Sequence, residues 1–95
     1  MRNLRASLAF TPSDGAFSLP SSNPSLLFRF SSGACAGTIF GAFTQTRDGS
    51  EVSPGSQVEA NLEFWADKAA AIEVGDTFAI WYGHDVGKGS ITEAR

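Results

Sequence analysis

From residue 58 to residue 64 the chain reads Val58-Glu59-Ala60-Asn61-Leu62-Glu63-Phe64. Apolar and polar side chains alternate at every position, and successive side chains of a β-strand point to opposite faces. This run therefore predicts a strand with one face in a core and the other in water. A helix would spread the same apolar residues around its circumference.

The same period of two recurs along the chain, and turn signals separate the repeats. The predicted strands cover residues 4–11, 25–32, 37–46, 56–65, 77–82 and 86–93. Turns are expected at Asp48-Gly49, Pro54-Gly55 and Gly83-His84-Asp85. A loop is expected over 12–24, and a turn or single helical turn over 67–73. Short strands with Gly- and Pro-rich turns favour an all-β barrel or sandwich.

The aromatic residues divide into two groups on this pattern. One group is predicted to fill the core: Phe28, Phe30, Phe43, Phe64 and Phe78. The other falls outside the core. Trp65 shares the polar face with Glu59 and Glu63, and Trp81 lies opposite Phe78 and Ile80. Aromatic residues on the outside of a barrel are typical of binding surfaces. The predicted partner surface is Trp65, Trp81, Tyr82 and His84.

Composition places the chain among small globular domains and argues against nucleic acid as the main partner. The 95 residues are expected to form one domain, 42% of them are hydrophobic, and the net charge is −3. Nucleic-acid-binding domains usually carry an excess of basic residues. No apolar run follows Arg2 and Arg5, so neither a signal peptide nor a membrane span is expected. The cytoplasm is the expected location, and the single Cys35 suits it.

Four groups of residues are candidates for reactive sites. His84 with Asp85 is too few ligands for a metal site and has no nucleophile motif beside it. The segment 83–90 does not match a phosphate loop, because Gly89 follows Lys88 and no helix can follow. Glu59 and Glu63 are interpreted as a solvated strand face, and Cys35 as a small hydrophobic residue. No enzyme activity, cofactor or metal is expected.

Three stretches in order resemble the C-terminal β-barrel domain of the translation elongation factor EF-Tu. They are Phe28-Arg29-Phe30-Ser31-Ser32 with Ala36-Gly37-Thr38-Ile39, then Val52-Ser53-Pro54-Gly55, then residues 71–75, 78–80 and 86–89. The resemblance spans nearly the whole chain. It implies a closed six-stranded antiparallel Greek-key barrel, and it implies partners among translation proteins and tRNA. The turn at His84-Asp85 lacks the arginine that this family carries there, which argues against tRNA binding.

Three hypotheses of function follow. The favoured one is a non-catalytic interaction module that binds another protein or itself. The second is an RNA- or tRNA-binding module, which requires Arg29, Arg47 and Lys88 to gather on one face. The third is a small hydrolase using His84 and Asp85, which requires a concave pocket around His84.

Overall fold

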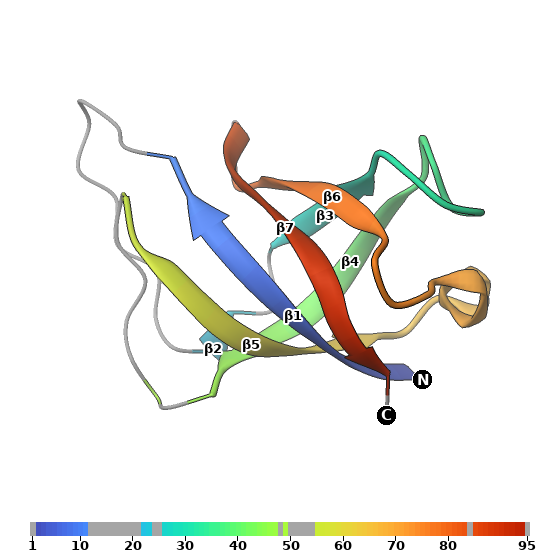
Figure 1. The fold of residues 1–95 in the computed structure, drawn as a ribbon, viewed down its shortest axis with the longest axis horizontal. Helices are drawn as coiled ribbons and strands as arrows, with labels where there is room; N and C mark the ends of the chain where they lie inside the picture. The colour runs from blue at the N-terminus through green and yellow to red at the C-terminus, as the bar shows by residue number, and fades with distance from the viewer. Residues whose placement is uncertain are drawn as a thin grey trace.

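A computed structural model describes residues 2–11, 22–23, 26–47, 49, 55–83 and 85–94 (Figure 1). Most of the predicted loop 12–24 lies outside the described residues, as do Asp48, Pro54 and His84. Where the turns are described, each contains a glycine with positive φ: Gly49, Gly55 and Gly83. This left-handed conformation is the one that glycine adopts without steric cost.

Strands form at all six predicted places, with ends that shift by up to two residues. They are β1 (Arg2–Phe10), β3 (Leu27–Phe30), β4 (Ile39–Thr46), β5 (Gln57–Phe64), β6 (Thr77–Trp81) and β7 (Asp85–Ala94). A two-residue strand, β2 (Ser22–Asn23), lies against β4. In β1 the alternation is complete, since Leu4, Ala6, Leu8 and Phe10 are buried and the residues between them are not.

The six long strands close into an antiparallel barrel. Their order is β4-β3-β6-β7-β1-β5, and β5 pairs again with β4 through Ala42 to Thr46, which completes the circuit (Figure 1). Strands β3, β4 and β5 are successive neighbours, and β6 returns to lie beside β3, which is the Greek-key arrangement. The predicted fold is thus confirmed. The resemblance to the EF-Tu domain stays a prediction, because one fold serves many families.

Five of the buried phenylalanine rings pack against one another in the interior, mostly edge to face. The ring centroids of Phe28 and Phe78 are 5.2 Å apart at 88°, and those of Phe40 and Phe64 are 5.7 Å apart at 82°. Phe30 completes the group. The assignment of Phe43 to the core was wrong. Phe40 points inward and Phe43 points outward. The prediction failed because both faces of residues 39–43 are apolar, so alternation alone does not say which face is buried.

Two inward-facing glycines in β7 make room for this aromatic core. A Cβ atom on Gly89 would lie against the Ser7 carbonyl oxygen and 2.9 Å from the Phe78 ring. A Cβ atom on Gly87 would lie 2.5 Å from the Ala9 carbonyl oxygen. Because these positions have no side chain, β7 can approach β1 closely while Phe78 fills the adjacent interior.

The segment between β5 and β6 forms the single helical turn predicted there. It is a 3₁₀ helix, η1 (Asp67–Ala71), and Arg2 Nη1 donates a hydrogen bond of 2.9 Å to the Ala69 carbonyl. Cys35 is buried beside it, with Sγ 3.7 Å from the Lys68 carbonyl oxygen. This position fits the predicted role of Cys35 as a small apolar side chain.

The glycine packing predicts a difference between two otherwise similar substitutions. Gly89→Ala should lower the free energy of unfolding by about 1–3 kcal/mol, because the added methyl group overpacks the interior. Gly41→Ala is the matched control, since its Cβ would meet only Leu27 Cδ2 at 3.8 Å. It should leave stability within about 0.5 kcal/mol of the parent. Urea denaturation followed by circular dichroism measures both, and equal midpoints for the two variants would contradict this packing.

Candidate functional site

Several large apolar side chains remain on the outside of the barrel. The most exposed among the described residues are Ile39, Val74, Trp65, Trp81 and Tyr82. Trp65 is 51% and Trp81 43% exposed, so the prediction that both tryptophans face solvent is confirmed. Tyr82 directly follows Trp81 and is also exposed. His84, the fourth residue of the predicted surface, lies outside the described residues.

The strand register gathers part of this apolar surface into one place. Residues directly opposite each other on paired strands point to the same face. Leu27 of β3 lies opposite both Gly41 of β4 and Trp81 of β6. In the next outward row, Arg29 lies opposite Ile39 on one side and Ala79 on the other, and Ala79 lies opposite Lys88. Segments far apart in sequence therefore share one outer surface.

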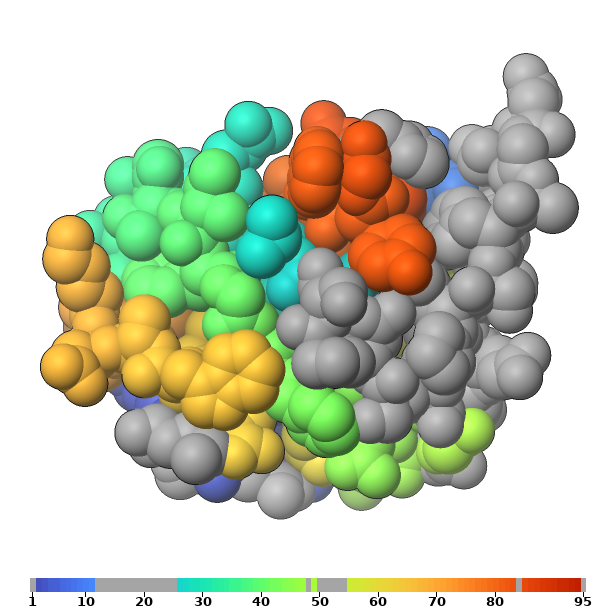
Figure 2. All heavy atoms as spheres, turned by 180° about the vertical axis from the view of Figure 1, so that it is seen from behind, coloured from blue at the N-terminus to red at the C-terminus, as the bar shows by residue number. Residues whose placement is uncertain are grey.

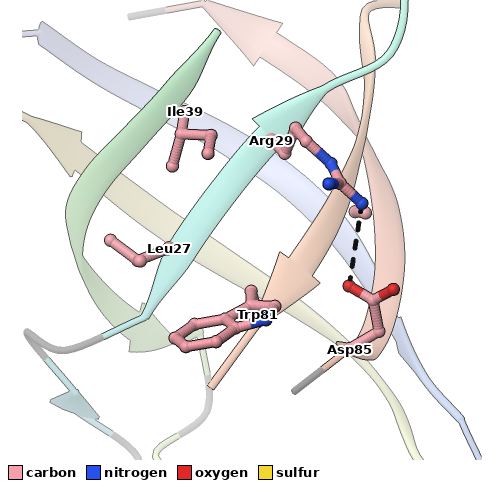
Figure 3. A pocket seen from close by; sticks show the side chains of 6 residues that line it. Leu27, Arg29, Ile39, Trp81 and Asp85 are labelled. Atoms are coloured by element: carbon pink, nitrogen blue, oxygen red, sulfur yellow. Dashed lines mark ion pairs between the residues drawn. The ribbon is translucent and has the colours of Figure 1, made fainter. Parts of the chain in front are cut away.

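A groove of about 270 Å³ lies on this surface, and we call it the outer groove (Figure 3). Its lining residues are Leu27, Arg29, Ile39, Ala79, Trp81 and Asp85. Figure 3 shows Leu27, Ile39 and Trp81 on the apolar side, and Arg29 pointing toward Asp85. The volume is below the range of about 300–1,000 Å³ that drug-sized ligands occupy. A groove of this size suits one side chain of a partner better than a whole cofactor.

The polar end of the outer groove is a loose ion pair. Arg29 Nη2 lies 3.9 Å from Asp85 Oδ1, and the two side chains are 56% and 66% exposed. Asp85 lies opposite Trp81 of β6, whereas Arg29 lies opposite Ala79, so Arg29 reaches Asp85 diagonally across the outer face of β6. An exposed ion pair of this length contributes little to stability.

Trp65 does not line the outer groove. It follows the last residue of β5, Phe64, which pairs with Ala42 of β4. Strands β4 and β3 lie between β5 and β6 along one face of the barrel. Figure 2 shows this face, where the segments near residue 65 (gold), in β4 (green), in β3 (teal) and near residue 81 (orange) follow one another.

The three basic residues of the RNA hypothesis do not all come together. Arg29 and Lys88 flank Ala79 in one outward row. Arg47 follows the far end of β4, eight residues or about 25 Å along the chain from Ile39. It is bound there to Glu59, with Nη1 2.7 Å from Oε2. The structure thus brings together two of the three residues that this hypothesis requires.

The remaining candidates have structural explanations. Residues 85–90, within the segment that was compared with a phosphate loop, belong to strand β7. Glu59 is an exposed ion-pair partner of Arg47, as expected for a solvated strand face. Within the described part of the chain, no three His, Cys, Asp or Glu side chains are grouped closely enough to hold a metal ion. No helix in that part is long and apolar enough to cross a membrane.

Sequence reasoning identified Trp81 but missed most of the groove around it. Leu27 and Ile39 looked like ordinary strand residues, and Ala79 carried no signal at all. The groove exists because β3 pairs with β6, about 50 residues further along the chain. One signal was available: by alternation Ile39 shares a face with Gly41 and Phe43, so it becomes exposed once that face is recognised as the outer one.

Comparison with known proteins identifies no relative: no protein-family model and no curated protein matches this chain. The outer groove is therefore interpreted from its own chemistry.

The half-exposed tryptophans should be removable without unfolding the barrel. Trp81→Ala and Trp65→Ala should each lower the free energy of unfolding by less than about 1.5 kcal/mol, because only part of each side chain leaves water on folding. Phe64→Ala, at a fully buried position, should cost about 3–5 kcal/mol. Thermal and urea unfolding measure these values. A tryptophan variant as unstable as Phe64→Ala would show that the side chain supports the core.

Proposed function

We propose that this barrel is a non-catalytic protein-interaction module, and that the outer groove with Trp81 and Tyr82 is its contact surface for a segment of a partner protein. The observation that carries the proposal is the position of Trp81. A tryptophan that is 43% exposed forms one wall of an apolar groove on a barrel whose core is already filled. Tryptophan and tyrosine are the residues most often responsible for binding energy at protein interfaces.

The chemistry of the lining residues supports binding over catalysis. The six side chains that form the outer groove include one carboxylate, Asp85, and neither a hydroxyl nor a thiol group. A hydrolase site of the kind considered for His84 and Asp85 needs a nucleophile or an activated water beside its base. The apolar walls instead suit the insertion of a partner's side chain.

The expected setting of this module is the cytoplasm, and its first candidate partners come from the resemblance to EF-Tu. Cys35 is the single cysteine of the sequence and is buried as a free thiol, which suits a reducing compartment. If the resemblance holds, proteins that bind the EF-Tu C-terminal barrel are the first to test. Binding of tRNA is the competing outcome, because Arg29 and Lys88 share one face.

A comparison of single-tryptophan variants tests the proposal. Wild-type, Trp81→Ala and Trp65→Ala barrels are immobilised, exposed to lysate of the source organism, and the bound proteins and RNA are identified. A candidate partner is then purified and titrated by calorimetry. Trp81→Ala should weaken its binding by about thirtyfold or more, the effect of losing one interface hot spot. Trp65→Ala, outside the groove, should change affinity by less than about threefold.

Two outcomes would contradict this proposal. A purified partner that binds wild type and Trp81→Ala equally would remove the outer groove from the contact surface. The RNA-binding module would be favoured instead if tRNA is recovered, if the Lys88→Gln substitution reduces its retention, and if added salt reduces that retention steeply.

A further inference from the structure

We infer that the outer groove recognises an acidic peptide segment, in which an apolar side chain enters the groove and a neighbouring carboxylate pairs with Arg29. This inference rests on the proposed function and specifies the chemistry of the partner. Leu27, Ile39 and Trp81 contact the apolar side chain. Arg29 exchanges its weak pairing with Asp85 for the partner's carboxylate.

The apolar walls and the cation belong to the same groove. Arg29 and Leu27 are two residues apart on β3, so both side chains point outward. Ile39 and Ala79 lie directly opposite Arg29 on the neighbouring strands. An apolar group between Leu27, Ile39 and Trp81 therefore lies within a side chain's length of the guanidinium group. A ligand with adjacent apolar and charged groups can satisfy both at once.

Arg29 is available for a new partner because its present one holds it weakly. Charge-assisted hydrogen bonds to a carboxylate normally measure about 2.7–2.9 Å. The distance from Arg29 to Asp85 is 3.9 Å, whereas the distance from Arg47 to Glu59 is 2.7 Å. Arg47 thus donates a short hydrogen bond to its carboxylate partner, whereas the Arg29–Asp85 pair is too long for one, although both arginines are exposed.

The local charge around the outer groove is opposite in sign to that of the whole chain. Arg29 and Lys88 flank Ala79, and Asp85 is the one carboxylate that lines the groove. Arg29 and Asp85 balance each other within the lining, and Lys88, which lies outside the lining but in the same outward row, adds one positive charge on a chain whose net charge is −3. Complementary charge steers a partner to its site and selects against the wrong sign. This positive balance favours an acidic segment.

A peptide fits these observations better than RNA does. Nucleic-acid surfaces usually carry many cations along the path of the phosphate backbone. Here two cations lie beside an apolar groove, and the third candidate, Arg47, is bound to Glu59 elsewhere. Binding of RNA is therefore the alternative that the peptide titration must distinguish from binding of an acidic peptide.

Two capped dipeptides that differ only in charge provide the test. Acetyl-Leu-Asp-amide and acetyl-Leu-Asn-amide are titrated into the isotopically labelled protein, and amide shifts are followed by NMR. We expect weak, millimolar binding with shifts concentrated at residues 27–29 and 79–81. The Asp peptide should bind about two- to fivefold more tightly than the Asn peptide, as for an exposed ion pair. Salt should reduce that difference.

Three variants assign the preference to Arg29. Arg29→Gln should abolish the difference between the two peptides, whereas Arg47→Gln, at the other exposed ion pair, should preserve it. Asp85→Asn should strengthen binding of the Asp peptide, because it removes the competing carboxylate. All three positions are exposed, so the spectra of the variants should retain the dispersion of a folded barrel.

Several results would overturn the inference. If both peptides bound equally in the groove, the groove would remain the proposed contact surface but would have no preference for an acidic ligand. No shift at groove residues would also overturn the inference, while the titration of a purified partner against Trp81→Ala decides the proposed function separately. A dimer seen by sedimentation and lost in Trp81→Ala would make a second copy the occupant. Tighter binding of an oligouridine at the same residues would make RNA the occupant.

Discussion

The close approach of β7 to β1 and to the Phe78 ring is the constraint on which the rest of the structure depends. Gly87 and Gly89 occupy inward-facing positions, where an added Cβ atom would collide with the backbone of β1. At Gly89 the Cβ atom would also collide with the Phe78 ring. Their missing side chains let β7 bridge β6 and β1, and the circuit of paired strands closes only through that bridge. The interior that results is filled by phenylalanine rings in edge-to-face contact, a favourable geometry for aromatic pairs.

Closure of the barrel also determines where recognition can occur. The six long strands pair with neighbours on both sides, so none of them offers an open edge to which a partner strand could add. On the outer face, the pairing of β3 with β4 and β6 sets Leu27, Ile39 and Trp81 around one groove and Arg29 at its end. The groove is a consequence of register: one residue of slip would turn these side chains inward.

The sequence predicted the strands and the fold class because alternation is a local property. Residues 58–64 and β1 could be assigned from their own neighbours, and the exposure of Trp65 and Trp81 followed from the same pattern. Residues 39–43 are apolar on both faces, so local alternation could not separate Phe40 from Phe43. The outer groove depends on the pairing of β3 with β6 and of β6 with β7. Arg29 is 50 or more residues from Ala79 and Asp85 in the sequence, so its proximity to them could not be predicted.

Site-specific photo-crosslinking most directly tests whether the outer groove is the contact surface. A benzophenone amino acid at Ile39, on the rim of the groove, is compared with one at Gln57, an exposed residue of β5 outside it. The account predicts that a purified partner crosslinks to the Ile39 position, and that Trp81→Ala removes this product. Equal crosslinking from the two positions, or crosslinking from the Gln57 position alone, would contradict it.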